Sequence, residues 1–220
     1  MDASAPFPKE ARGKYTAFTY TNLKGSKGQP VGVSAIKDLG VTHVQLLPVF
    51  DFESVDESDP SFNWGYDPQN YNVPEGSYST DPANPKKRII ELKTGIQSLH
   101  SQGLRAIMDV VFNHVYDARS FSENLITPGY WFRTDSSGNL TNASGCGNDV
   151  ASERPMVRKF IVDSVKYWAK EYNLSGFRFD LMGILDKTTM NQIRAELNKI
   201  DPTILMIGEG WNMGDVLPDA

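Results

Sequence analysis

The chain has 220 residues, of which 40% are hydrophobic and 22% are charged, a balance that fits one or two globular domains. Its formal net charge is −5 and it has no basic cluster interleaved with aromatic residues, which disfavours nucleic acid and anionic membranes as partners. No apolar run approaches the roughly 20 residues that cross a bilayer, and the N-terminus lacks the features of a signal peptide. The single cysteine, Cys146, cannot form an internal disulfide and leaves the compartment open.

The first predicted elements are a short helix and a buried strand. The helix covers 34–39 and stops at Gly40, and the strand covers the β-branched and apolar run 42–49. The segment that follows, 50–84, is too long for an ordinary loop between a strand and a helix. Because it leaves the C-terminal end of a strand, we expect it to help build a binding or catalytic site.

A second helix and strand come next. Apolar residues recur at spacings of three and four in 85–102, with Pro at the start and Gly just past the end, which predicts a helix. Its first turn contains Lys86, Lys87 and Arg88, which we expect on a solvated face. The apolar run 104–111 predicts the next strand.

The remaining elements repeat this alternation. A second long connection, 112–153, again follows a strand, and it is succeeded by a predicted helix over 155–172. A strand over 175–181, a helix over 188–200 and a strand over 203–207 complete the pattern.

Alternating helices and continuous apolar strands predict an α/β fold, with a parallel sheet covered by helices. Long βα loops at the C-terminal ends of the strands are typical of α/β barrels, which build their active sites there. We expect an N-terminal extension over 1–14 and one barrel-type domain over 15–220 that contains about four parallel strands.

Polar residues gather where the last three predicted strands end. In a parallel sheet these ends meet on one face, so Asp180 and Glu209 should point from adjacent strands into the same pocket. Two carboxylates about 5–5.5 Å apart suit retaining glycoside hydrolysis, in which one attacks the anomeric carbon and the other handles the proton. Arg178 lies on the same strand face as Asp180 and could keep it ionised.

Other interpretations of these residues stay open on spacing alone. Each carboxylate could equally be a surface or capping residue, and His114 could be a hydrogen-bonded histidine at a strand end. The chain has no helical pair of metal ligands at i, i+4, which disfavours a zinc site. No cofactor is assigned; calcium could bind near Asn113 or Asn148–Asp149, although loop hydrogen bonding explains these residues as well.

Three short motifs make the chain resemble a known family. The segments 109–114 (DVVFNH), 176–180 (GFRFD) and 208–211 (GEGW) resemble, in order, three of the four motifs of the α-amylase superfamily. The segment 63–68 (NWGYDP), followed by 71–82, is similar to the signature of type I pullulanases, and 180–183 (DLMG) is typical of debranching enzymes. The chain is thus identified as a member of the type I pullulanases of glycoside hydrolase family 13, from about Tyr15 to Trp211.

The resemblance implies a role for each matching residue. Asp180 would be the nucleophile and Glu209 the general acid/base, and Tyr66 would stack on the sugar at the cleavage site. The remaining substrate-binding candidates are Trp64, Asp109, Asn113, His114, Arg178 and Trp211. The substrates would be pullulan and branched α-glucans, cleaved at α-1,6-glucosidic links. Such pullulanases occur both inside and outside bacterial cells, so the compartment stays unknown.

The resemblance also implies a partial (β/α)8 TIM barrel, because the family has eight strands and the four predicted here resemble its strands 2–5. We expect the missing strands to take with them a third catalytic Asp, so that the isolated chain could be inactive. Exposed edges of an open barrel would favour self-association. The alternatives are an isoamylase or glycogen-debranching enzyme, a non-catalytic fragment that binds α-glucan, and a remnant without function.

Overall fold

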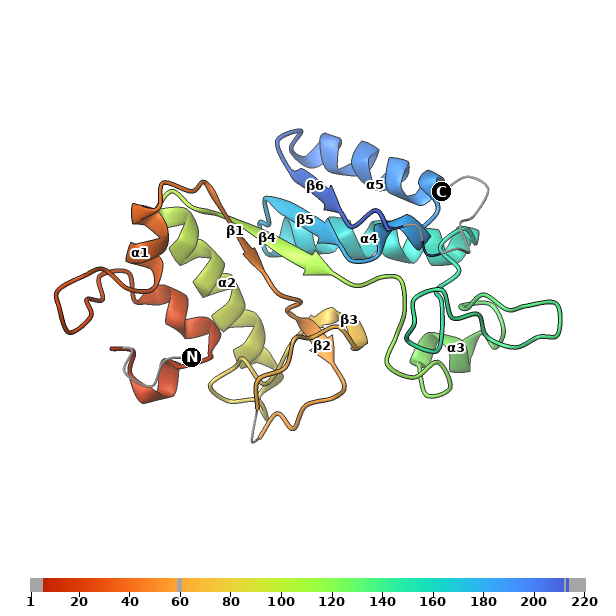
Figure 1. Ribbon diagram of the computed structural model, residues 1–220, viewed down its shortest axis with the longest axis horizontal. Coiled ribbons are helices and arrows are strands. Elements are labelled where there is room, and N and C mark those ends of the chain that lie inside the picture. The colour runs from red at the N-terminus through yellow and green to blue at the C-terminus, as the bar shows by residue number, and fades with distance from the viewer. Residues whose placement is uncertain (1–5, 59–60, 212, 214–220) are drawn as a thin grey trace.

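A four-stranded parallel sheet organises the molecule (Figure 1). In this computed structural model, residues 6–58, 61–211 and 213 are described. The strand order is β1-β4-β5-β6, with β1 at His43–Leu46, β4 at Arg105–Val110, β5 at Gly176–Phe179 and β6 at Leu205–Gly208. The structure therefore confirms the predicted parallel sheet of four strands.

Helices connect the strands and cover the sheet as the sequence pattern predicted. These helices are α1 (Val33–Asp38), α2 (Pro85–Ser101), α4 (Pro155–Glu171) and α5 (Lys187–Ile200). Two of them begin at a capping side chain: Asn84 accepts from the Lys86 N–H at 3.2 Å, and Asp186 accepts from the Thr189 N–H at 2.9 Å. In Figure 1, α2 lies beside β1 and β4, whereas α4 and α5 lie beside β5 and β6.

The two long connections contain structure that the sequence pattern did not predict. The first holds a hairpin of β2 (Phe50–Phe52) and β3 (Pro68–Pro74), whose pairing shifts register twice. Because β3 begins and ends with proline and has no simple alternation, it does not read as a strand. The second connection contains α3 (Ser122–Ile126), and three 3-10 turns occur at η1 (Lys9–Ala11), η2 (Tyr15–Thr19) and η3 (Met182–Ile184).

Aromatic packing attaches both connections to the sheet and to α4. The Tyr71 ring, on β3, lies 5.5 Å from Phe50 and 5.2 Å from Phe112, centroid to centroid. The Tyr71 hydroxyl donates to the His114 carbonyl at 2.8 Å, and the Trp168 ring N–H of α4 donates to the Tyr71 carbonyl at 2.9 Å. The end of β4 is thereby held against the hairpin and the helix.

The basic start of α2 corrects one sequence interpretation. Lys86 and Lys87 are exposed as expected, but Arg88 is buried, with 9% of its surface accessible. Its guanidinium contacts the carboxylates of Asp51 and Glu57 at 3.4 and 2.7 Å. A run of like charges on a helix does not place all of them in solvent, because successive residues point in different directions around its axis.

The outer strands leave part of the sheet exposed. β4 is buried from Ala106 to Val110, whereas β6 exposes Leu205 and Ile207 by 39% and 44%. Such an edge fits the predicted self-association, which stays a prediction, as does the boundary between 1–14 and 15–220. Within the described residues, no helix has the length and apolar character to cross a membrane.

Candidate active site

Arg178 links three carboxylates at the C-terminal ends of the strands. It stands on β5, directly beside Asp109 of β4 in the register. One terminal nitrogen, Nη1, lies 3.0 Å from Asp109 Oδ1 and 2.9 Å from Asp180 Oδ1, and the other, Nη2, lies 3.2 Å from Glu209 Oε2. The structure thus brings together the two carboxylates that the sequence predicted, on a single guanidinium.

Both carboxylate oxygens of Asp180 have a partner. Oδ1 accepts from Arg178, and Oδ2 accepts from the side-chain amide of Asn113 at 2.9 Å. The same Asn113 amide donates to the Asp180 carbonyl at 2.9 Å, so one side chain fixes both the backbone and the carboxylate. Asp180 is 8% exposed, and these contacts hold it in one orientation.

Glu209 is held in its ionised form. Its Oε2 accepts from the Leu181 N–H at 3.0 Å as well as facing Arg178. Burial raises the pKa of the Glu209 carboxyl, but hydrogen bonds from the Leu181 N–H and the Trp211 side chain, with the charge of Arg178, bring the pKa below its usual value. The ionised Glu209 carboxylate can accept a proton as a base at once, but it has to gain a proton before it can act as an acid.

Tyr66 and Asp109 form one wall of the site. The Tyr66 hydroxyl donates to Asp109 Oδ2 at 2.7 Å, which connects the hairpin loop to β4. Burial raises the pKa of the Tyr66 hydroxyl well above its ordinary value, and the Asp109 contact raises it further. Asp109 is 1% exposed, and burial raises its pKa against the lowering effect of hydrogen bonds from Tyr66 and Arg178.

His114 contacts both Tyr66 and Asn113 through its ring nitrogens. Its Nδ1 lies 2.5 Å from the Asn113 side-chain oxygen, and its Nε2 lies 2.8 Å from the Tyr66 carbonyl oxygen. Burial lowers the pKa of the His114 ring, against the raising effect of the Tyr66 carbonyl and of the nearby carboxylates. The His114 ring therefore joins the 63–68 loop to Asn113, while its role in catalysis or in structure alone stays a prediction.

A glycine gives the 63–68 loop its shape. Gly65 has a φ of +81°, and a Cβ there would lie 3.0 Å from the Phe52 ring, so a larger residue would be strained and crowded. The Gly65 N–H donates to the Asn63 side chain at 2.8 Å. This turn places Tyr66 toward Asp109, while Trp64 is 63% exposed and contacts Phe62 with ring centroids 5.5 Å apart.

The two tryptophans differ in whether they contact a carboxylate of the site. Trp211 is 62% exposed, yet its side chain lowers the pKa of Glu209 through a hydrogen bond. Trp64 contacts its aromatic neighbour at the rim of the loop. The sequence did not indicate a role for Leu181. Its contribution to the site is a backbone N–H that donates to Glu209, and every residue type except proline has such a group.

Loop hydrogen bonds occupy the residues considered for calcium. Asp149 Oδ2 accepts from the Thr141 hydroxyl and the Ala143 N–H, and its Oδ1 accepts from the Ser144 N–H. The Asn148 side chain makes two hydrogen bonds with the Val115 backbone, at 3.0 and 2.8 Å. These contacts favour the loop-bonding interpretation.

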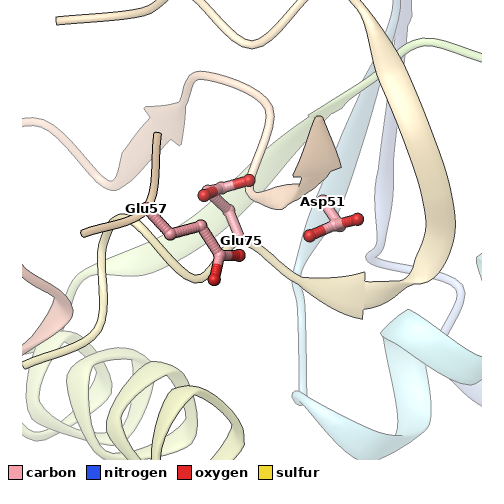
Figure 2. Close-up of side chains that lie close together, drawn as sticks. All are labelled: Asp51, Glu57 and Glu75. Carbon is pink, nitrogen blue, oxygen red and sulfur yellow. The ribbon is translucent and has the colours of Figure 1, made fainter. Parts of the chain in front are cut away.

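A second acidic cluster, Asp51, Glu57 and Glu75, lies beside the hairpin, as Figure 2 shows. One carboxylate oxygen from each of the three lies within 4.8 Å of the other two. The Arg88 guanidinium contacts Asp51 and Glu57, and Glu75 accepts from the Phe52 and Ser77 N–H groups at 3.1 and 2.6 Å. A positive charge is therefore already present in this cluster, and it joins the hairpin to α2.

A groove of about 960 Å³ lies elsewhere, between the 123–131 segment and α4. Its lining includes Trp131, Phe160 and Tyr167, and it includes none of the residues predicted for catalysis or substrate binding. The candidate active site is therefore the surface formed by the strand ends, where the carboxylates meet.

A parallel β/α sheet with carboxylates at the C-terminal ends of neighbouring strands is the arrangement that TIM-barrel glycoside hydrolases use for their catalytic residues. Comparison with known families agrees. The model of the α-amylase catalytic domain matches residues 28–137, half of the chain, and the chain belongs to that family. This matched range contains Tyr66, Asp109 and His114.

Individual relatives narrow the resemblance to pullulanases. The chain is 50% identical over 209 residues to the pullulanase of Bacillus subtilis (strain 168), and the match covers 94% of the chain and 29% of that relative. It is 35% identical to the chloroplastic pullulanase 1 of Arabidopsis thaliana, covering 94% of the chain and 25% of the relative. The predicted resemblance to type I pullulanases is confirmed.

Solved structures give the same result. A pullulanase from Paenibacillus barengoltzii, in complex with maltohexaose and α-cyclodextrin, matches with a TM-score of 0.92 and 53% identity. That match covers 98% of this chain and 35% of the other. The chain thus spans about a third or less of the length of these relatives, and the fold prediction of a partial barrel is confirmed.

Proposed function

We propose that this chain carries the nucleophile and the general acid/base of a retaining glycoside hydrolase that cleaves α-1,6-glucosidic links in pullulan and branched α-glucans. The observation that carries the proposal is the contact of one guanidinium with both Asp180 and Glu209, at 2.9 and 3.2 Å. Two carboxylates that contact the two terminal nitrogens of one guanidinium lie close enough to share one substrate, as the double displacement of retaining enzymes requires.

In the first step, a carboxylate oxygen of Asp180 attacks the anomeric carbon. The bond from that carbon to the departing O6 breaks, and Glu209 gives its proton to this oxygen. The result is a glucosyl ester on Asp180 and a free hydroxyl on the leaving chain. The Arg178 and Asn113 contacts hold the Asp180 carboxylate in place for this attack.

In the second step, water attacks the same carbon from the face that the leaving chain has vacated. Glu209, now a carboxylate, takes the proton from this water, and the ester bond to Asp180 breaks. The anomeric configuration of the sugar is thereby retained. Tyr66, fixed by its hydrogen bond to Asp109, is the ring that we assign to stacking on the reacting sugar.

The protonation of Glu209 sets a condition for this mechanism. Its pKa is below the usual value in the free site, so it has to gain a proton when substrate binds. A bound sugar excludes water and removes part of the hydration of the carboxylate, and desolvation raises the pKa of a carboxyl group. We therefore infer that Glu209 acts as an acid only when a sugar is bound.

The substrate assignment rests on relatives and on the aromatic residues near the site. Solved pullulanases that match this chain were crystallised with maltotriose, maltotetraose and maltohexaose. Those ligands support α-glucan as the substrate class. Trp64 and Trp211, both largely exposed, are the residues that we assign to further glucose units.

The test is release of reducing sugar from pullulan by the purified chain, with amylose as the α-1,4 control substrate. Asp180→Asn and Glu209→Gln should each abolish the activity, whereas Asp38→Asn on the exposed surface of α1 should leave it unchanged. Proton NMR of the first product should show the α anomer. Activity that persists in Asp180→Asn would contradict the assignment of the nucleophile.

A second candidate function is binding of α-glucan without cleavage, for which the exposed rings of Trp64 and Trp211 offer stacking surfaces. If the chain binds α-glucan without cleaving it, calorimetry with maltohexaose should give heat in wild type and Asp180→Asn alike, and no reducing sugar should appear. Loss of both binding and hydrolysis would reject both candidates.

A further inference from the structure

The residue after Asp180 has an unusual backbone. Leu181 has φ +40° and ψ +45°, the left-handed region that side chains other than glycine seldom adopt. It is one of two such non-glycine residues in the described part of the chain. Met182–Ile184 then forms the 3-10 turn η3, so the chain reverses directly behind the nucleophile.

This reversal turns backbone N–H groups toward the neighbouring strand end. The Leu181 N–H donates to Glu209 Oε2 at 3.0 Å, and the Gly183 N–H donates to the Glu209 carbonyl at 3.1 Å. The Glu209 N–H in turn donates to the Phe179 carbonyl at 3.0 Å. Glu209 is therefore fixed at its N–H, its carbonyl and its side chain by one segment, 179–183.

Two glycines permit this close approach. A Cβ on Gly183 would lie less than 3.0 Å from the Trp211 carbonyl oxygen, and a Cβ on Gly208 would lie less than 3.0 Å from the Met182 side chain. Gly210 lies between Gly208 and Trp211 in the sequence, but a Cβ added to it would have no atom within 4 Å. Neither Gly183 nor Gly208 has a positive φ, so close packing, and not backbone freedom, requires glycine there.

We propose that the Leu181–Gly183 turn is the positioning element for Glu209, and that Gly183 is a positioning residue for the proposed hydrolysis. The turn belongs to the segment of the nucleophile, so a shift of either carboxylate moves the other. This inference rests on the proposed function for its catalytic meaning, while the contacts themselves are independent of it.

Several charged groups face the Glu209 carboxylate and have to be kept constant in a test. Arg178 contacts it from β5, Asp180 lies at the end of the same strand, and Asp109 of β4 acts through Arg178. A substitution in the Leu181–Gly183 turn keeps all three of these charged residues in the chain. A change in the titration of Glu209 then reports its distance from the Leu181 N–H.

The hydrogen bond can be observed directly by NMR on the 220-residue chain. Labelling with carbonyl-¹³C aspartate and ¹⁵N leucine selects Asp–Leu pairs, of which the sequence has two, Asp38–Leu39 and Asp180–Leu181. The amide of Leu181 should move with pH as Glu209 titrates, and Glu209→Gln should remove that movement. Leu39 follows the end of α1, is exposed and serves as the internal reference.

Two alanine variants then separate positioning from a general effect of substitution. Gly183→Ala should push the 209–211 segment away and lower kcat about 100-fold, because a displacement of 1 Å at a catalytic group can cost that much. KM should change far less, and the titration seen at the Leu181 amide should move to higher pH. Gly210→Ala, the matched control, should behave as wild type.

The outcomes decide the inference whether or not the chain is active. A Leu181 amide that does not follow Glu209 in the wild-type chain would overturn it, and this measurement needs no variant in the turn. Equal losses of activity in Gly183→Ala and Gly210→Ala would also overturn it. If pullulan is not hydrolysed but the amide titrates as expected, the proposed function fails and the positioning contact stands.

Discussion

The buried arginine at the start of α2 offers a test of how the hairpin is held. We consider Arg88→Met, which keeps the aliphatic length of the side chain and removes its charge. The substitution deletes contacts to Asp51 and Glu57 at 3.4 and 2.7 Å, together with hydrogen bonds to the Pro74 and Pro82 carbonyls at 3.3 and 3.0 Å. All four acceptors then lose a donor, and two of them are negatively charged.

The expected loss follows from how well water can reach these acceptors. Removing one partner of a fully buried ion pair costs about 3–5 kcal/mol. The Glu57 side chain is 31% exposed and Asp51 is 15% exposed, so hydration offsets part of that cost. We therefore expect Arg88→Met to lower the free energy of unfolding by about 2–3 kcal/mol, or about 5–10 °C in Tm for a domain of this size.

Urea unfolding followed by circular dichroism measures this loss. Lys87→Met is the matched control, because Lys87 is 46% exposed and its nearest carboxylate oxygen lies 3.9 Å away. It should cost less than about 0.5 kcal/mol. Burial raises the pKa of Asp51, and without Arg88 this carboxyl protonates more readily, so the loss should shrink as pH falls toward about 4. Equal stability of the two variants would refute the reasoning.

Three further predictions follow from the site. Tyr66→Phe removes the hydroxyl that donates to Asp109 and should lower kcat/KM about 10-fold in the pullulan assay, with unchanged anomeric outcome; an unchanged rate would show that the contact is dispensable. His114 has a lowered folded-state pKa, so its contribution to stability is present above its unfolded pKa of about 6.5 and is lost as pH falls through the folded value. Unfolding of His114→Gln between pH 5 and 8 should be less pH-dependent than that of wild type, and parallel curves would contradict this. Gly65→Ala should cost about 1 kcal/mol more than Gly28→Ala, since both have a positive φ but only Gly65 is crowded, and thermal melting can compare them.

The main elements of the fold could be predicted from the sequence because their patterns are local. The helix predicted over 85–102 is observed over Pro85–Ser101, and the strand predicted over 104–111 is observed over Arg105–Val110. Spacings of three and four, a leading proline and a continuous apolar run are each sufficient for such assignments. The hairpin of β2 and β3 lacked these signals, since its pairing is irregular and β3 carries proline at both ends.

The candidate site could be predicted in its residues but only partly in its contacts. Asp180, Glu209 and Arg178 were assigned from strand ends and motifs, and the structure brings them together. The sequence did not indicate that Arg178 would also contact Asp109, nor that Asn113 would hold Asp180. Such contacts depend on the register between β4 and β5, which pairs Asp109 with Arg178 across 69 residues of chain.

Short segments were enough to predict the alternation of strands and helices and the residue types that can attack and donate protons, because periodicity and side-chain chemistry are local properties. Which of those groups come into contact depends on how distant segments pack. The packing of β5 against β6 turns the Leu181 N–H toward Glu209, and the folding of the hairpin onto α2 buries Arg88 among carboxylates. Both effects join residues far apart in the chain, so no pattern within a short segment can reveal them.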